Sequence, residues 1–481
     1  HIEDTLKGGS LLAGREAVRG LCESASELIH RLEKLGTVFS LEEGKLATRA
    51  FGGQSHKRTY YCGSATGKHI VSALVMEVRR YEALGLIERK LFTWFHSALI
   101  KEGVCHGALL YNDKLGQLEE HYVSALVLAT GGQNALFGKT TGSTICDGYA
   151  AGKLFMQGAV LKNLEFIQYH PTTLETAQKR MLISEAVRGE GGRLFYLEGE
   201  KRVYFMEEKY GPRGNLMTRD VVAREMFATG KEIYLDISFL GKEKIERRLP
   251  EVRELCLKYR GIDITKDPIP VSPSVHFFMG GFAVHLNHET SIQNLFAVGE
   301  CASMYHGANR LGGNSLLAAL YGGTKAASAI AEREEAAEKP DFSKVIEAER
   351  ETLEKMRQST SPFPVMYIRD MVAELMKREL GIVREEEALK KGLQDMDYYL
   401  SVASQIRYDG SVSTYANFSL PAILTLARAT LTCAMERKES RGSHYRSDYP
   451  QSKEELCMAS LISYEEGAYR FTYDKEGLYE S

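Results

Sequence analysis

The stretch His306-Gly307-Ala308-Asn309-Arg310-Leu311-Gly312-Gly313-Asn314-Ser315 joins an apolar, strand-like run at residues 295–298 to a run at 316–320 that is typical of a helix start. A strand, a glycine-rich loop and a helix start form the usual platform for a phosphate or a dinucleotide. Arg310 adds a rigid fork of donors beside a pair of glycines, and such a fork matches a carboxylate with two hydrogen bonds. Taken alone, the loop would be interpreted as a glycine turn with a surface arginine. Its meaning therefore depends on the rest of the chain.

The composition of the chain limits its class. A length of 481 residues is too great for one compact core, so we expect about two to four domains. The 61 basic and 64 acidic residues give a net charge of −3, which offers no electrostatic case for binding nucleic acid or an acidic membrane surface. No apolar run is long enough for a membrane-spanning helix. The start at His1 has neither an initiator methionine nor a signal-peptide pattern, so we expect it to lie within a longer protein.

The eight cysteines are scattered and form no C-x-x-C pair. A disulfide framework, a zinc site and a cysteine-ligated cluster are therefore not expected. We predict reduced, mostly buried thiols in a cytosolic protein and no metal site. Any iron–sulfur centre that works with this protein is expected on another chain.

A second glycine turn is typical of cofactor binding. The apolar segment that ends at Leu128 runs into Ala129-Thr130-Gly131-Gly132, where backbone can approach a cofactor closely. This signal is weak alone, because strands often end in two glycines. It gains weight from Asp147 shortly afterwards, which is placed to accept a hydrogen bond from a ribose or ribityl hydroxyl.

Two histidines in the middle of the chain are candidates for substrate binding. We predict that His170 lies at a strand end, braced by Pro171, and that His276 precedes the turn Met279-Gly280-Gly281. The alternative for either histidine is a structural residue with satisfied hydrogen bonds. That alternative is the commoner case for a lone histidine.

Charged residues near glycine turns point to an anionic substrate. Glu185 and Arg188, which follow Ser184, are three residues apart and would pair if that turn is helical; the alternative is a surface ion pair of little energetic value. Arg219 begins a predicted helix, where the helix dipole disfavours a cation unless an anion is near. Together with Arg310 and the two histidines, these residues predict a site for a small dianion such as a dicarboxylate.

Periodicity predicts the remaining elements. Apolar spacing favours helices over residues 11–35 and 67–81, and long amphipathic helices over 342–356 and 365–384. A hairpin-like pair is expected around 108–111 and 121–128. The glycine-rich loop 49–56 is expected to line a cavity or a turn.

The ordered motifs resemble those of the flavoprotein subunits of succinate dehydrogenase and fumarate reductase, in a family that also contains L-aspartate oxidase. The matching segments occur in the same order over nearly the whole chain; they are 170–172, 184–192, 219–222, 276–281, 299–302, 306–315, 439–444 and 448–450. The resemblance implies an α/β, Rossmann-like FAD-binding domain in two parts, 1–162 and 277–332. It also implies an inserted α+β capping domain at 163–276, a three-helix domain at 333–437 and a short tail at 438–481.

The resemblance implies roles for individual residues. Arg219 matches the arginine that transfers the substrate proton, and Glu185 and Arg188 match the relay that connects it to solvent. The groups that would clamp the two substrate carboxylates are His170, Ser184, His276 and Arg310. Ser184 is commonly threonine in the family, and the hydroxyl is kept. The positions that would bind FAD are Gly131, Gly132, Asp147, Glu300, Ser315 and Leu316.

The implied reaction is the interconversion of succinate and fumarate by hydride transfer at flavin N5 with arginine-mediated proton transfer. The implied partners are an iron–sulfur subunit and, through it, a membrane quinone-reactive subunit. The protein would then be cytoplasmic and attached peripherally to the inner face of the cell membrane. Neither the physiological direction nor a covalent link to FAD is decided by the residues.

Three alternatives accompany this interpretation. L-aspartate oxidase usually has a glutamate for the substrate ammonium where this chain has Phe51, which would leave an ammonium unpaired at a cost of several kcal/mol. A soluble fumarate reductase would need no partner. The third alternative is a flavin-free structural or docking fragment, because the chain lacks the first strand and the G-x-G-x-x-G turn with which the family begins. We expect instead a missing preceding segment, since every downstream site residue is intact.

Overall fold

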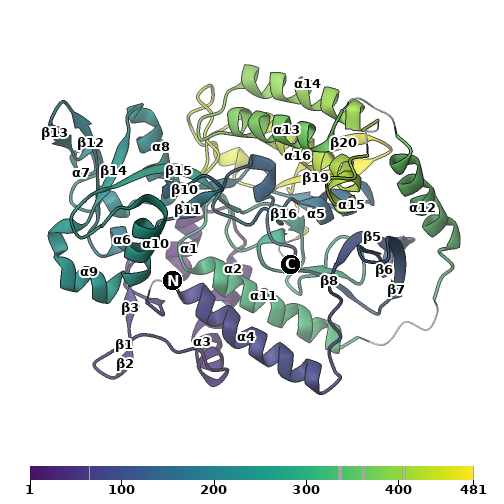
Figure 1. The fold of residues 1–481 in the computed structure, drawn as a ribbon, viewed down its shortest axis with the longest axis horizontal. Coiled ribbons are helices and arrows are strands. Elements are labelled where there is room, and N and C mark those ends of the chain that lie inside the picture. Colours follow the sequence, from purple (N-terminus) through teal and green to yellow (C-terminus); the bar gives the residue numbers. More distant parts are fainter. Residues whose placement is uncertain (64, 334–338, 360–362, 404, 407, 480–481) are drawn as a thin grey trace.

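The computed structural model describes residues 1–481 except 64, 334–338, 360–362, 404, 407 and 480–481. One lobe, formed by β10 to β15 and α6 to α10, lies to the left in Figure 1, and a group of long helices lies at the top. The β5–β6–β7 sheet and α12 lie on the opposite side from the first lobe. The stretch 334–338, within the charged segment at the predicted domain boundary, is outside the described residues.

The N-terminal region is helical. The helices are α1 (Ile2–Gly8), α2 (Arg15–Glu23), α3 (Ala25–Lys34) and α4 (Thr66–Ala83). The predictions of helix over 11–35 and 67–81 are confirmed, although the first region is divided into two helices at Ser24. Between α3 and α4 the chain forms short antiparallel pairs, β1 (Leu41–Glu42) with β2 (Lys45–Leu46) and β3 (Thr48–Arg49) with β4 (Thr59–Tyr60).

The predicted hairpin is correct in its first part and wrong in its second. Strands β5 (Thr93–Lys101), β6 (Val104–Asn112) and β7 (Gln117–Tyr122) form an antiparallel sheet. The second predicted strand does not continue to Leu128. It ends at Tyr122, and β8 (Leu126–Leu128) pairs instead in parallel with β17 (Leu295–Ala297). The turn 129–132 follows β8 directly, as expected.

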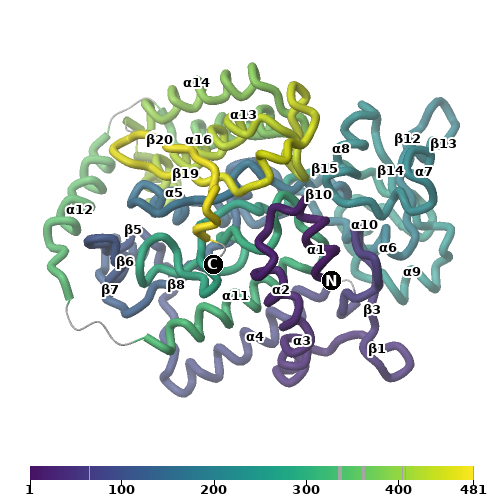
Figure 2. The backbone as a smooth tube through the Cα atoms, turned by 180° about the vertical axis from the view of Figure 1, so that it is seen from behind, coloured from purple at the N-terminus to yellow at the C-terminus, as the bar shows by residue number. Residues whose placement is uncertain are grey.

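A five-stranded sheet joins distant parts of the chain. Its order is β18 (Ala302–Ser303), β16 (Gly281–Ala283), β9 (Leu161–Lys162), β19 (Ser460–Glu465) and β20 (Ala468–Tyr473). The last two strands belong to the predicted tail, and both views show them close to α5 (Tyr149–Met156) (Figures 1 and 2). The C-terminal segment is therefore part of the central structure.

The six-stranded antiparallel sheet of the left lobe carries the two candidate histidines, His170 and His276. Its order is β11 (Arg180–Leu182), β10 (Ile167–Glu175), β15 (Ile269–Phe278), β14 (Ile233–Asp236), β12 (Arg193–Glu198) and β13 (Lys201–Val203). The helices of this lobe are α6 (Ala186–Gly189), α7 (Phe205–Tyr210), α8 (Arg219–Thr229), α9 (Lys242–Arg248) and α10 (Pro250–Arg260). They pack around an apolar core that includes Val187, Leu194, Val222 and Leu235.

The prediction that His170 lies at a strand end is wrong. His170 lies within β10, at a break in the register with β15 between His170 and Thr173. Pro171 lies at this break, which fits its lack of a backbone N–H to donate to a neighbouring strand.

The helices after residue 313 are more numerous than the three predicted for residues 333–437. They are α11 (Asn314–Ala331), α12 (Ser343–Arg357), α13 (Val365–Glu379), α14 (Glu386–Ala403), α15 (Thr414–Phe418) and α16 (Leu420–Glu436). Helices α13, α14 and α16 pack on one another, whereas α12 packs on the β5–β6–β7 sheet (Figure 1). The predicted helix 365–384 ends at Glu379, next to Gly381. No helix in the described part of the chain has the length and apolarity that a membrane span requires.

Glu349 connects helix α12 to the β5–β6–β7 sheet. His96 Nε2 lies 2.8 Å from Oε2 of Glu349, and Lys153 donates to Oε1 at 2.7 Å. Burial alone would raise the pKa of Glu349, but the hydrogen bond from His96 and the charge of Lys153 outweigh it and lower the pKa from 4.5 to about 2. Burial also lowers the pKa of His96, which favours its neutral form.

Acid is therefore expected to loosen α12. Because the folded-state pKa of Glu349 is below the unfolded one, its stabilisation is complete above about pH 4.5 and is lost as the pH falls toward 2. The free energy of unfolding of the wild type should fall between pH 5 and pH 2.5, and the part of this fall that is due to Glu349 should be on the order of 2 kcal/mol. Glu349→Gln should lack that part. Equal pH dependence in both proteins would contradict this assignment.

Candidate active site

All five predicted substrate-binding residues and two of the three predicted catalytic residues line one cavity of about 700 Å³, whereas Arg188 does not. Those present in its wall are Phe51, His170, Ser184, Glu185, Arg219, His276 and Arg310. They come from β10, β15, the start of α6, the start of α8 and two glycine-rich loops. The fold therefore brings together segments separated by more than a hundred residues, as the motif analysis required.

Glu185 lies between two arginines. Arg219 donates from Nε and Nη2 to Oε2 of Glu185, at 2.9 and 2.7 Å. Arg188 Nη2 lies 3.6 Å from Oε1 of the same carboxylate. Glu185 and Arg188 are almost completely buried, so the alternative of a surface ion pair is wrong. The helical turn α6 places the two residues on the same side, as their spacing predicted.

The electrostatics of this group favour an anionic ligand. Burial by itself would raise the pKa of Glu185, but the charges of Arg219 and Arg188 and the backbone N–H of Gly52 outweigh it and lower the pKa. Burial, opposed by the charge of Glu185, lowers the pKa of Arg188. Burial and the charge of Arg219 lower that of Arg310 well below its ordinary value. With all four groups ionised, three guanidinium groups against one carboxylate leave an excess of two positive charges.

The two histidines lie next to each other across β10 and β15, with ring centroids 5.1 Å apart. Burial and the charge of Arg219 lower the pKa of both well below the ordinary value, so both are neutral. Nε2 of His170 is buried without a hydrogen-bond partner among the described residues. In the tautomer protonated at Nε2, Nδ1 accepts from the N–H of Thr172 at 3.2 Å. His170 then presents a free donor at the cavity.

Arg310 packs on Phe277, and the loop that carries it is held by hydrogen bonds to other segments of the chain. Its guanidinium lies over the ring of Phe277, 4.2 Å from the centroid, and its Nε has no hydrogen-bond partner in the described part of the chain. The carbonyl of Ala308 accepts from the N–H and the hydroxyl of Ser443, at 3.0 and 2.9 Å. The N–H of Ala308 donates to the carbonyl of Gly9 at 2.9 Å. Two other segments of the chain thus fix the loop that carries this arginine.

The loop 49–56 lines the cavity, as predicted. The N–H of Gly52 donates to Oε1 of Glu185 at 2.6 Å, and a Cβ at position 52 would lie 2.7 Å from the same oxygen. A side chain at Gly52 would therefore displace the carboxylate. The ring of Phe51 lies against Gly312, where a Cβ would be 2.7 Å from Cδ2 of the ring. Phe51 itself contributes an apolar surface to this wall, and Oε2 of Glu185 lies beside it at Gly312.

Five of the six predicted cofactor residues fall into two groups. Ser315 and Leu316, at the start of α11, line the cavity with His170 and Arg310. Glu300 lies in a 3₁₀ turn beside the Gly131-Gly132 turn, where a Cβ at position 132 would meet its Oε1 at 2.5 Å. Burial raises the pKa of Glu300 to about 7.

Asp147 lies apart from the cavity wall. Its Oδ1 accepts from the N–H of Tyr149 at 3.1 Å and from the hydroxyl of Tyr415 at 2.8 Å. Arg369 lies 3.6 Å from Oδ2. These bonds already tie the carboxylate to the C-terminal helices, and no ligand-facing donor or acceptor has to be assumed to explain its burial.

Sequence reasoning missed Gln168 and Thr141. Gln168 accepts hydrogen bonds from Arg219 and Arg310, at 3.0 and 3.1 Å. The hydroxyl of Thr141 lies 2.7 Å from Nδ1 of His276. A signal for Gln168 was available, because residues two apart on a strand share a face and Gln168 precedes His170 by two. Thr141 had no comparable signal.

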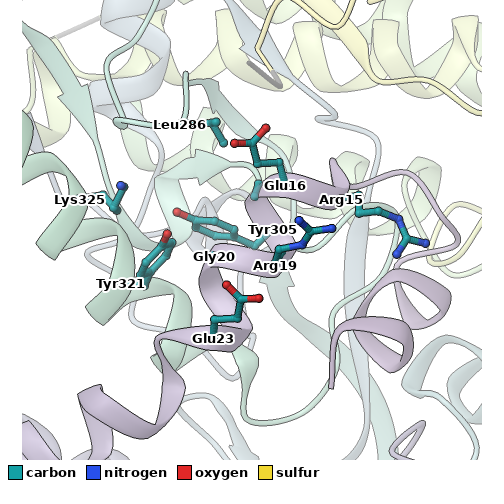
Figure 3. A pocket seen from close by; sticks show the side chains of 10 residues that line it. Arg15, Glu16, Arg19, Gly20, Glu23, Leu286, Tyr305, Tyr321 and Lys325 are labelled. Atoms are coloured by element: carbon teal, nitrogen blue, oxygen red, sulfur yellow. The ribbon is translucent and has the colours of Figure 1, made fainter.

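A second cavity, of about 590 Å³, lies between α2 and α11 (Figure 3). Its wall contains Arg15, Arg19 and Lys325 together with Glu16 and Glu23, so positive and negative charges alternate. It contains none of the predicted site residues. Its chemistry does not match the positive cavity described above.

Comparison with known proteins connects this site to a family. A family described as "FAD binding domain" matches residues 1–316, and one described as "Fumarate reductase flavoprotein C-term" matches residues 369–478. The succinate dehydrogenase flavoprotein subunit of Bacillus subtilis is 34% identical over 96% of this chain and 83% of its own length. The chain belongs to the succinate dehydrogenase and fumarate reductase flavoprotein family. This confirms the family resemblance of the motifs.

Two further relatives show the range of this flavoprotein family. FrdA of E. coli quinol fumarate reductase, in a mutant form, superimposes with a TM-score of 0.89, at 30% identity over 98% of this chain and 86% of that one. This likeness confirms the predicted fold class. The L-aspartate oxidase of Nostoc is 32% identical over 96% of this chain and 83% of its own length. Family membership therefore establishes a flavoprotein oxidoreductase.

The cofactor of this family is FAD, and the cavity fits a flavin. The cavity is larger than a four-carbon acid requires and has an apolar wall formed by Leu28 and Leu32 of α3, Ile70 of α4 and Leu320 of α11. Ser315 and Leu316, in the first turn of α11, lie in the wall of this cavity. Backbone N–H groups in the first turn of a helix have no acceptor within the helix, and they suit a carbonyl or an anion. The cavity therefore offers a flat ring an apolar surface on one side and the arginine group next to it.

Proposed function

We propose that this chain catalyses the interconversion of succinate and fumarate as the flavoprotein subunit of a larger complex. The observation that carries this proposal is the group of three arginines around Glu185 at the cavity, together with donors on His170 and Arg310 that have no hydrogen-bond partner in the described part of the chain. A dicarboxylate supplies two negative charges at the spacing of a small molecule. Such a ligand would satisfy the donors and offset the burial and the charge of Arg219 that lower the pKa of Arg310.

The roles of the residues follow from their positions. FAD, when bound, supplies the site that exchanges hydride with one carbon of the substrate. We propose that the two substrate carboxylates are bound by four side chains, those of His170, Ser184, His276 and Arg310. These contacts would fix the substrate and exclude water. We assign Arg219 to proton exchange with the other carbon. Glu185, which accepts hydrogen bonds from Nε and Nη2 of Arg219, is assigned to exchange that proton with Arg219.

Arginine holds its proton tightly in water, which makes a free neutral arginine a poor intermediate. We propose that the two proton transfers are concerted. When Arg219 gives a proton to the substrate carbon, Glu185 supplies one to Arg219 in the same step, and in the opposite direction Glu185 accepts the proton that Arg219 gains. Arg188 is fully buried, and it donates from Nη1 to the carbonyl of Asn215 at 2.7 Å. A path to solvent through Arg188 would therefore have to continue beyond it.

Phe51 argues against L-aspartate as the substrate. Its ring lines the cavity and offers no acceptor to a substrate ammonium. The nearby carboxylate of Glu185 already accepts from Arg219 and from the N–H of Gly52. We expect turnover with succinate and fumarate and at most about one hundredth of that rate with L-aspartate, measured with a redox dye. Equal or faster turnover with L-aspartate would overturn the proposal.

Phe51→Glu tests the same wall directly. A carboxylate at this position would repel a dicarboxylate, and we expect the KM for succinate to rise about tenfold or more. Phe239→Glu, at an exposed phenylalanine on the lobe surface, is the matched control. An unchanged KM in Phe51→Glu would mean that this wall does not face the substrate.

We propose an iron–sulfur subunit as the electron partner and, through it, a membrane quinone-reactive subunit. The support is the naming of the relatives as subunits of succinate dehydrogenase and quinol fumarate reductase. This arrangement would place the chain at the cytoplasmic face of the cell membrane. Copurification of an iron–sulfur protein with this chain from membranes tests it, and recovery of a fully active single chain would support a soluble reductase instead.

An absorbance spectrum before and after acid precipitation tests the cofactor. A flavin band that stays with the pellet indicates covalent FAD, and a band in the supernatant indicates noncovalent FAD. Absence of any flavin band from the purified chain would support the structural or docking alternative.

A further inference from the structure

Gln168 lies between the two arginines that face the cavity. Its Oε1 accepts from Nη1 of Arg219 at 3.0 Å and from Nη2 of Arg310 at 3.1 Å. Its Nε2 donates to Oδ1 of Asn309 at 2.8 Å and to the carbonyl of Arg310 at 2.7 Å. The side chain is completely buried. Both donors and both acceptor positions of this amide are therefore used.

The partners of Gln168 fix its orientation. A guanidinium group only donates and a carbonyl only accepts, so a flipped amide would face two donors with a donor and an acceptor with an acceptor. Asn309 is fixed in turn, because its Nδ2 donates to Oδ1 of Asp220 at 2.8 Å. An ordered series of hydrogen bonds thus leads from Asp220 through Asn309 and Gln168 to both arginines.

The two arginines belong to different parts of the fold. Arg219 is the first residue of α8, in the lobe built on the six-stranded sheet, and Arg310 lies in the loop before α11. Gln168, on β10, is hydrogen-bonded to both side chains. It is a neutral acceptor shared by two buried cations that repel each other.

We propose that Gln168 is a positioning residue that sets the separation of the Arg219 and Arg310 guanidinium groups for a dicarboxylate. This inference rests on the proposed function. A neutral amide suits the task, because it accepts from both cations without cancelling the charge that the substrate needs. A carboxylate at this position would compete with the substrate for the same donors, and an apolar side chain would leave both groups free to turn.

Two substitutions distinguish positioning from a merely structural role. Gln168→Glu keeps the shape of the side chain and both contacts with the arginines and adds a negative charge, but its second oxygen faces Oδ1 of Asn309 and the carbonyl of Arg310. Gln168→Leu removes all four hydrogen bonds. A merely structural role predicts that malonate binding falls in both variants in proportion to their loss of free energy of unfolding. Positioning by a neutral acceptor predicts weaker malonate binding to Gln168→Glu than to Gln168→Leu and a loss of kcat in both.

The measurement is the dissociation constant of malonate, a dicarboxylate that cannot be desaturated, followed through the flavin absorbance of the purified holoprotein. We expect Gln168→Glu to weaken malonate at least about tenfold relative to the wild type, and Gln168→Leu to weaken it several-fold less than that. The kcat of Gln168→Leu with succinate is expected to fall about tenfold or more. Weaker malonate binding to Gln168→Leu than to Gln168→Glu would overturn the proposal.

Gln157→Leu is the matched control. Gln157 also uses its amide twice, donating to the carbonyl of Ala98 and accepting from its N–H, at 2.9 and 3.1 Å. It is not among the residues that line the cavity. We expect an unchanged malonate dissociation constant and an unchanged kcat in this variant. An effect equal to that of Gln168→Leu would mean that the loss of any hydrogen-bonded amide lowers malonate binding and kcat, and that Gln168 has no special role.

A ligand-free crystal structure of Gln168→Leu separates this inference from the proposed function. We expect at least one of the two guanidinium groups to leave its wild-type position. Unchanged positions of both groups would overturn the positioning role, whatever the substrate. Absence of malonate binding to the wild type would instead count against the proposed function, and the crystal structure would still decide the role of Gln168.

Discussion

Arg219→Lys is expected to lower kcat for succinate and fumarate at least about a hundredfold while the flavin stays bound. The guanidinium makes three hydrogen bonds, two to Oε2 of Glu185 and one to Oε1 of Gln168. A lysine ammonium keeps the charge but has a single nitrogen, which cannot hold both partners and face the substrate as well. The loss should therefore fall mainly on kcat, because the charge that attracts a dicarboxylate remains.

The measurement combines dye-linked turnover with the flavin spectrum and the dissociation constant of malonate. Arg224→Lys is the matched control, because Arg224 lies on the same helix but stacks on Tyr445, 5.0 Å from the ring centroid. We expect this control to keep wild-type turnover. If Arg219→Lys stays within about fivefold of wild-type kcat, Arg219 does not carry the substrate proton.

Much of the site could be predicted from the sequence, because each motif places a polar residue at a glycine turn or a helix start. Arg219 at the start of α8 is an example. A cation there opposes the helix dipole, and the structure supplies the carboxylate of Glu185 at 2.7 Å. The same reasoning led from the glycine-rich loop 49–56 to a cavity wall.

The remaining features depend on pairings between distant segments. The partner of β8 is β17, and no local pattern near Leu128 reports that choice, which explains why a continuous hairpin strand was predicted. The register break at His170 depends on the opposing strand β15. Thr141 meets His276 only because a loop folds back onto β15. Such contacts are properties of the tertiary structure.

The buried charges behind the loop 306–315 show the same dependence. Glu439 and Arg441, which belong to one of the family motifs, lie next to Arg437 at the end of α16. Glu439 accepts at Oε1 from Arg437 and Arg441, at 2.9 and 2.8 Å, and at Oε2 from Arg441 and the N–H of Lys453, at 3.1 and 2.8 Å. Both side-chain oxygens are thus saturated, and the carboxylate is fully buried.

Glu439→Gln is expected to destabilise the fold by about 3–5 kcal/mol, because removing one partner of a buried ion pair leaves an uncompensated charge. The amide nitrogen of glutamine would also face N–H groups, whichever way it turns, so at least two hydrogen bonds become clashes between donors. Denaturant unfolding of the flavin-bound protein measures the change. Glu436→Gln, at an exposed position three residues earlier, should stay within about 0.5 kcal/mol.

The effect is expected to reach the substrate loop. Arg441 donates to the carbonyl of Ser10 at 3.1 Å, and the neighbouring Ser443 donates to the carbonyl of Ala308, two residues before Arg310. Loss of the Glu439 charge would weaken the two hydrogen bonds that Arg441 makes to this side chain and so loosen the turn that supports this carbonyl. We therefore expect Glu439→Gln to weaken malonate binding as well as stability. A stability loss with an unchanged malonate dissociation constant would mean that the loop is held by Gly9 and by its own contacts with Gln168 and Phe277.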